Sequence, residues 1–359
     1  MSDGWTDTRS RTLVNFLVYC TKGTMFLKSL DLSGVPKTTE TLFNVFDNVV
    51  QEVGPANIVQ FITDNAANYR AAEDLLFQKY RKFYWSPCAT HCVNLMLQDL
   101  NEMHDMKSAI DQCQKVTKFI CNHAYVLSLM RKFTKRVELI RPAQTRFATN
   151  VLTVESVVKQ RTPLRQMFAS EEWAAYPHAH KRNASLVVDI VFNNEFWESC
   201  VKLLKVCVPL VKVLRLADSD DRLSIGYLKG NLLSIDKAKA AIRDNLKGKK
   251  KLYMPIWKII DKRWTGQLHQ PLHAATYYLN PAIRFSPTFK KDREVLGGLL
   301  DYINVLVADS REQDVVHNEL DVYDTCFRNR GQPVTIRART TMRPGKYIEI
   351  FNLLCICYI

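Results

Sequence analysis

The first sixty residues alternate between strand-like and helix-like hydrophobic patterns. Residues 12–19 and 25–31 are rich in β-branched and aromatic side chains, and a Thr-Lys-Gly turn separates them. This arrangement predicts a β-hairpin. Residues 38–53 carry apolar side chains three and four positions apart, and the pattern stops at Gly54-Pro55. The spacing predicts a helix that crosses over to the next strand.

The stretch from residue 57 to residue 97 organises the chain. An apolar run at residues 58–62 stops at Thr63-Asp64-Asn65, which predicts a buried strand of the parallel type. A helical period then follows, with Glu73 and Asp74 expected to face away from its apolar side. Asp64 would thus lie at the carboxyl end of a strand, where ligands and catalytic groups gather in open α/β sheets. The alternative is that its carboxylate only caps the helix.

A compact thiol and imidazole motif comes next. After a hinge predicted at residues 85–87, the chain reads Cys88-Ala89-Thr90-His91-Cys92 and enters another amphipathic helix. Cys88 and His91 have the spacing of half a zinc site, but His104 and Cys113 are irregular partners for the other half. The alternative is that the thiol and imidazole pack beneath the sheet.

Helical patterns dominate from residue 100 to residue 291. Residues 151–158, 196–216 and 225–246 each predict an amphipathic helix. Lys249, Lys250 and Lys251 lie in a charged loop that can contact phosphates or simply remain solvated. His269 and His273 are one helical turn apart, but no glutamate lies between them as in metalloproteases, so we expect packing and surface roles rather than a zinc site.

Composition narrows the class of protein. The chain has 359 residues, 47% of them hydrophobic, which is ample for a core. Fifty basic residues against 36 acidic ones give a net charge of +14, which favours polyanionic partners such as DNA. Ten cysteines without framework spacing predict reduced thiols in the nucleus or cytosol. No apolar run is long enough to predict a membrane span, so we expect no membrane partner.

Four collinear motifs resemble a known superfamily. They are SDGWTDTRSRTLVNFLVYCTKGTMFLKSLD near the start, TDNAANY, then W-x-P-C-A-x-H-C-x-N-L-M-L, and DKRWTGQLHQPLHAATYYLNP at residues 261–281. Together they resemble the plant-type branch of the hAT transposase superfamily, in the domain of unknown function that accompanies it. The resemblance implies an α/β fold, a ribonuclease H-like mixed sheet interrupted by a large all-α insertion. It implies a partial ribonuclease H-like core at residues 1–100, a helical insertion domain at 101–290 and a degraded or truncated segment at 291–359.

The resemblance also implies roles for individual residues. Asp3 and Asp64 match the first two of three acids that hold catalytic divalent metal, Mg²⁺ when the site is complete. The third acid, a glutamate, has no counterpart, because none of the later glutamates has matching flanks; these are Glu294, Glu312, Glu319 and Glu349. Cys88 and His91 would face DNA. Arg146 and Phe147 resemble an Arg-Trp pair that contacts DNA, with the alternative that Phe147 packs in the core.

Both ends of the chain differ from the family pattern. Only two residues precede Asp3, so we expect most of its strand to be missing, and residues 350–359 form an uncapped apolar run. We therefore expect a nuclear, hAT transposase-derived protein, truncated at both ends. It would be catalytically inactive, would use no cofactor and would bind DNA weakly through charge. It would form a homo-oligomer only if a dimerisation segment exists. The alternatives are a fragment of an active metal-dependent transposase and a protein-binding scaffold on the same fold.

Overall fold

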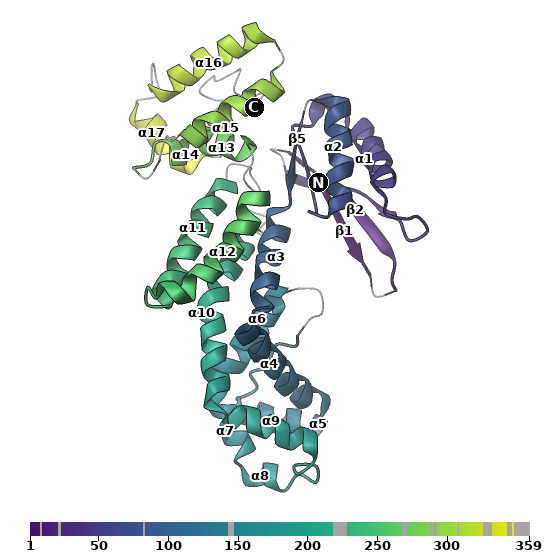
Figure 1. The fold of residues 1–359 in the computed structure, drawn as a ribbon, viewed down its shortest axis with the longest axis vertical. Coiled ribbons are helices and arrows are strands. Elements are labelled where there is room, and N and C mark those ends of the chain that lie inside the picture. Colours follow the sequence, from purple (N-terminus) through teal and green to yellow (C-terminus); the bar gives the residue numbers. More distant parts are fainter. Residues whose placement is uncertain are drawn as a thin grey trace. The chain divides into compact units, whose positions relative to one another are not determined.

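The chain divides into two compact units. The computed structural model describes residues 1–7, 9–20, 23–81, 83–142, 147–217, 228–267, 271–287, 289, 293–307, 309–325, 332–342 and 347. The sheet unit comprises Met1–Cys92, Asp220–Leu232 and Trp264–Ile359, and the helical unit comprises Val93–Ser219 and Leu233–Arg263. The helical unit is therefore inserted into the sequence of the sheet unit. Figure 1 shows the ribbon.

Two small sheets lie in the sheet unit. Strands β1 (Ser2–Thr6), β2 (Thr12–Cys20) and β3 (Gly23–Asp31) form an antiparallel sheet in that order. Strands β4 (Gln60–Thr63) and β5 (Tyr84–Pro87) pair in parallel, and β4 lies beside β1. The predicted hairpin and the predicted parallel strand are both confirmed.

The strand that carries Asp3 is present. β1 pairs with β2 along its whole length, with Asp3 opposite Asn15. Beyond the ladder, the Leu17 N–H donates to the Met1 carbonyl at 3.0 Å, and the Met1 ammonium donates to the Leu17 carbonyl at 2.8 Å. Burial lowers the pKa of that ammonium to about 6. Residues Ser2–Thr6 therefore form a paired strand that holds Asp3 in the sheet.

Two helices and the strands enclose the core of the sheet unit. Helix α1 (Thr39–Val53) is capped by Thr38 and ends at Gly54, whose φ of 88° suits glycine. A short 3-10 turn at Pro55–Asn57 leads into β4, and α2 (Ala67–Tyr80) packs beside α1. Phe46 is fully buried, and its ring centroid lies 5.2 to 6.1 Å from those of three aromatic residues on β2, β4 and α2, namely Phe16, Phe61 and Tyr69. The predicted helix at residues 38–53 is confirmed.

Two local predictions in this region were wrong. Residues 85–87 belong to β5 rather than to a hinge, because Trp85 and Ser86 pair with Phe61 and Ile62. On α2, Glu73 is only 3% exposed, whereas Leu75 is 39% exposed. Glu73 lies four residues after Tyr69 and three before Leu76, so helical geometry places it on the buried face despite its charge.

The C-terminal part of the sheet unit is helical. Its helices are α13 (Pro271–Leu279), α14 (Pro281–Arg284), α15 (Arg293–Leu306), α16 (Ser310–Asp324) and α17 (Pro333–Thr341). The ring of Tyr302 on α15 stacks 4.8 Å from that of Tyr84 on β5, and the Tyr84 hydroxyl donates to the Asp301 carbonyl. On α17, Thr335 and Ala338 are buried on one helical face.

The described part of the helical unit contains α-helices only. After α3 (Ala89–Asn101), which begins in the sheet unit, come α4 (His104–Asn122), α5 (Ala124–Phe133), α6 (Phe147–Lys159), α7 (Arg161–Phe168), α8 (Glu171–Ala174), α9 (Arg182–Phe192), α10 (Asn194–Ala217), α11 (Leu228–Asn245) and α12 (Lys250–Gln267). Helices α4, α6 and α10 pack against one another. The predicted α/β fold class with a large helical region is confirmed. No described helix has the length and apolar character to cross a membrane.

Candidate functional site

The two predicted catalytic acids meet where β1 lies beside β4. Asp3 is the second residue of β1 and is exposed, and Asp64 directly follows β4. The Gly4 N–H donates to Asp64 Oδ2 at 3.4 Å, which ties the two strands together at this point. Burial raises the pKa of Asp64, and the negative charge of Asp3 raises it further, against the opposing effects of His91, Gly4 and Lys37. The two carboxylates therefore lie near enough to repel each other.

Asp64 does not cap the following helix. Helix α2 starts at Ala67, and its N-cap residue, Ala66, makes no side-chain capping bond. The hydrogen bond to the Asp64 carboxylate comes from β1 instead. The capping alternative was therefore wrong, and the carboxylate faces the neighbouring strand.

The Cys-x-x-His motif lies beside this acid. The Cys88 N–H donates to the Thr63 carbonyl at 2.8 Å, continuing the pairing of β4 with β5. His91, in the first turn of α3, places Nδ1 at 3.7 Å from Asp64 Oδ1, within ion-pair distance when the imidazole is protonated. Burial raises the pKa of the Cys88 thiol, as do the charges of Asp64 and Asp3, so the thiol stays protonated at neutral pH. The structure thus brings Asp3, Asp64, Cys88 and His91 to one edge.

A buried tyrosine on α2, Tyr69, lies at the same place. The Tyr69 hydroxyl is buried and has no hydrogen-bond partner among the described residues. Burial and the charges of Asp64, Asp3 and Glu73 raise its pKa to about 12. A Cβ on Gly4 would lie 2.4 Å from this hydroxyl, so a larger residue on β1 would force the Tyr69 side chain to shift. In the sequence, the glycine next to Asp3 could have indicated that another side chain approaches β1 closely at this point.

Glu73 is the second residue whose role the sequence interpretation missed. The Thr63 hydroxyl hydrogen-bonds to its carboxyl group, and Thr63 also accepts from Trp85 Nε1 at 3.2 Å. Burial raises the pKa of Glu73 to about 9, so this side chain is neutral at pH 7. Its helical spacing from Tyr69 and Leu76 could have predicted that Glu73 lies on the buried face of α2.

The described donor groups do not fit the metal site that the family resemblance implies. Mg²⁺ prefers ionised carboxylates, and Asp3 and Asp64 supply only two. Glu73 is a neutral acid buried against Thr63 and is a poor ligand for such a cation. Over the described ranges, no three His, Cys, Asp or Glu side chains are placed to hold a metal ion. The zinc partner considered for Cys88 and His91 is also engaged elsewhere, because Cys113 Sγ lies 3.5 Å from Cys200 Sγ.

The predicted DNA-contacting lysines belong to the helical unit. Lys249, Lys250 and Lys251 are exposed, and no ion pair joins them to another described residue. Lys250 and Lys251 lie in the first turn of α12 rather than in the predicted loop, since α12 begins at Lys250. These lysines thus lie on an exposed turn and helix start.

Two other predictions fall wholly or partly outside the described residues. Arg146 lies outside them, and Phe147 begins α6 without a described side chain. His269 is likewise outside them, and the side chain of His273 on α13 is not described. The structure therefore does not test the Arg-Phe pair or the His pair.

A known family model matches the part of the chain that contains this acidic edge. Residues 1–116 match the family model of a domain of unknown function, DUF659. This domain is typical of plant hAT-like transposase-related proteins. The DUF659 region contains the five strands found among the described residues, and with them Asp3, Asp64, Cys88 and His91. No curated protein matches the chain.

Proposed function

We propose that this chain is a hAT transposase-derived protein that binds DNA through charge and does not catalyse transposition. The observation that carries the proposal is the edge at which Asp3 and Asp64 meet while the nearby Glu73 is buried and hydrogen-bonded to Thr63. The acid pair supports descent from a metal-dependent enzyme. The DUF659 match supports the same ancestry.

The donor chemistry supports the lack of catalysis. Two-metal phosphoryl transfer needs carboxylates that hold both ions close together. Asp3 and Asp64 are two such groups, whereas Glu73 hydrogen-bonds to Thr63 in its neutral form. A pair of acids leaves the second ion without its ligand, and most of the rate enhancement depends on that ion.

The charge distribution supports DNA binding by the helical insertion. The net charge of +14 favours a polyanion, and Lys249, Lys250 and Lys251 have no described carboxylate partner. Lys250 and Lys251 lie at a helix N-terminus, where the helix dipole disfavours cations, so helix stability does not explain them. Phosphate contact would offset that cost. Cys88, His91, Arg146 and Phe147 are further proposed contacts, and the proposed location is the nucleus.

A salt titration tests the proposed DNA contact. Replacing Lys249, Lys250 and Lys251 by alanine should weaken binding to every duplex alike and reduce the slope of log affinity against log salt by about 2 to 3. Fluorescence anisotropy with two unrelated labelled duplexes would measure both quantities.

The matched control removes three other exposed lysines of the helical unit: Lys115, Lys118 and Lys205. It changes the net charge equally and should leave most of the affinity. Unchanged affinity and slope in the first variant, or an equal loss in the control, would exclude the α12 turn as the contact surface.

A second candidate function is metal-dependent strand cleavage as part of an active transposase. The meeting of Asp3 and Asp64 favours it. A nicking assay with magnesium separates it from the first proposal. The third candidate, a protein-binding scaffold, would show DNA affinity that does not fall steeply with salt.

A further inference from the structure

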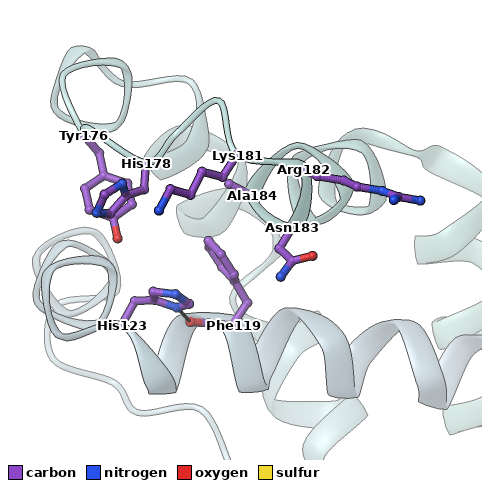
Figure 2. A pocket seen from close by; sticks show the side chains of 8 residues that line it. All are labelled: Phe119, His123, Tyr176, His178, Lys181, Arg182, Asn183 and Ala184. Atoms are coloured by element: carbon purple, nitrogen blue, oxygen red, sulfur yellow. Dashed lines mark hydrogen bonds between the residues drawn. The ribbon is translucent and has the colours of Figure 1, made fainter.

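The helical unit contains a cavity of about 400 Å³ far along the chain from the acidic edge. Figure 2 shows it between the C-terminal part of α4 and the segment that leads into α9. Phe119 and His123 line it from α4, and Tyr176, His178 and Lys181 line it from the other side. Its volume falls within the roughly 300 to 1,000 Å³ usual for small-ligand sites.

The lining is cationic and contains no acid. Its charged side chains are Lys181 and Arg182, with His123 and His178 beside them. Lys181 extends between the ring of Phe119 and those of Tyr176 and His178 (Figure 2). Lys181 and Arg182 are exposed and form no ion pair within the described part of the chain.

The acid on neighbouring α8 does not neutralise this lysine. Glu172 pairs with Lys132 instead, and that hydrogen bond lowers the pKa of Glu172. The Tyr125 hydroxyl donates to the Glu172 carbonyl, which holds α8 against α5. Lys181 therefore faces the cavity with its charge uncompensated, so an anionic group on a ligand would be attracted there.

The aromatic side chains of the cavity are held in place. His123 Nδ1 lies 2.7 Å from the Phe119 carbonyl, and because a carbonyl only accepts, Nδ1 carries the proton. The rings of Phe119 and His123 lie 4.5 Å apart, and Trp173 meets the Phe119 ring edge-on at 6.2 Å. Tyr176 is fixed on the opposite wall by stacking 4.9 Å from Tyr125. The cavity thus offers a rigid, half-buried aromatic ring next to a free ammonium.

We propose that this cavity binds a nucleotide. Lys181 would pair with the phosphate, and the base would stack on Phe119. The Asn183 amide, which also lines the cavity, can both donate to and accept from a base edge. The nucleotide would be either free or one unit of a single-stranded nucleic acid, since both present the same phosphate and planar base. This inference does not rest on the duplex contact proposed for Lys249, Lys250 and Lys251.

Calorimetry on the full chain tests the cavity with three probes: dAMP, deoxyadenosine and inorganic phosphate. We expect dAMP to bind about tenfold more tightly than either part alone, because only dAMP uses both the ammonium and the ring. Lys181→Glu should weaken dAMP binding by about tenfold or more. Phe119→Leu, which keeps an apolar side chain but removes the ring, should weaken dAMP binding while leaving phosphate binding unchanged.

Lys118→Glu is the matched control. Lys118 is exposed on α4 next to Phe119 but does not line the cavity, so the same charge change there should alter dAMP affinity by less than about twofold. Failure of dAMP to bind, or equal losses in Lys118→Glu and Lys181→Glu, would overturn the proposal. The unfolding temperature of each variant shows whether it is folded.

A 5′-phosphorylated oligodeoxyadenylate distinguishes the two sources of nucleotide. Much tighter binding than dAMP, lost in Lys181→Glu, would assign the cavity to a strand of nucleic acid, and equal binding would assign it to a free nucleotide. The triple alanine variant at Lys249, Lys250 and Lys251 should keep its dAMP affinity. The experiments can therefore contradict the nucleotide proposal without contradicting the proposed DNA contact, and the reverse.

Discussion

At the scale of single residues, burial decides which acids around β4 carry charge. Asp64 is part-buried beside Asp3, and its pKa is raised by burial and by that neighbour. Glu73 is more deeply buried, and its pKa is raised to about 9. Burial therefore raises the pKa of both acids and leaves Glu73 neutral at pH 7. Sequence reasoning found Asp64 from its place after a strand, but it assigned Glu73 to the surface because it is charged.

Glu73 gives the stability of the protein a specific pH dependence. Its folded-state pKa of about 9 exceeds the ordinary 4.5, so the folded state binds the proton more tightly than the unfolded state. Its contribution is complete below pH 4.5 and is lost as the pH rises toward 9, amounting to roughly 3 kcal/mol of loss at pH 7. Glu73→Gln should thus be more stable than wild type at pH 8, with the difference vanishing near pH 4.

Urea denaturation at a series of pH values measures this difference. Glu195→Gln on the exposed start of α10 is the control and should follow the wild-type curve. If the unfolding free energies of wild type and Glu73→Gln run parallel from pH 4 to pH 9, Glu73 is not a buried neutral acid.

The close approach of Gly4 on β1 to the Tyr69 hydroxyl on α2 can also be tested by substitution. Gly4→Ala places a methyl group 2.4 Å from the Tyr69 hydroxyl and should cost about 1 to 3 kcal/mol of unfolding free energy. Tyr69→Phe removes that hydroxyl, so the double variant should recover most of the loss. Denaturant midpoints of the four proteins in the cycle measure the coupling. Additive effects of the two substitutions would show that β1 and α2 do not approach each other in this way.

At the scale of elements, the spacing of apolar residues along the chain predicted the helices and strands that pack one face against the core. The hairpin of β2 and β3, helix α1 and helix α10 follow this rule. β5 was missed because a four-residue strand ending in proline has the composition of a turn, and its pairing with β4 depends on a residue twenty-four positions away. Helix α17 was missed because Gly and Pro flank a short basic segment whose buried face has only two small residues.

Packing of α1 on the strands can be tested through Phe46. Phe46→Ala should destabilise the protein by about 3 to 5 kcal/mol, because the ring is fully buried among three other rings. Phe26→Ala on β3 removes the same atoms from a side chain that is 58% exposed and should cost much less. Chemical denaturation compares the two variants. Equal losses would contradict the assignment of the core to the α1 side of β2.

At the scale of the whole molecule, the sequence predicted the fold class and the domain family that matches one region. The α/β fold with a large helical region is confirmed, and the DUF659 match covers residues 1–116. The helical cavity lies beyond that region, and nothing in the spacing of its residues pointed to it. Phe119 and Lys181 are sixty-two positions apart, and only the packing of α4 and α9 brings them together. The domain limits at residues 100 and 290, the nuclear location and the oligomeric state remain predictions.

A plasmid-nicking assay is the most direct test of the central proposal, that the chain binds DNA without cleaving it. The purified chain should be incubated with supercoiled plasmid and Mg²⁺ at low salt, alongside the Asp64→Asn variant. We predict that the plasmid is bound but is not nicked above the level seen with Asp64→Asn, because no described residue adds a third ionised carboxylate to the acid pair. Magnesium-dependent nicking by the wild-type chain that Asp64→Asn abolishes would contradict this prediction and would identify an active transposase site.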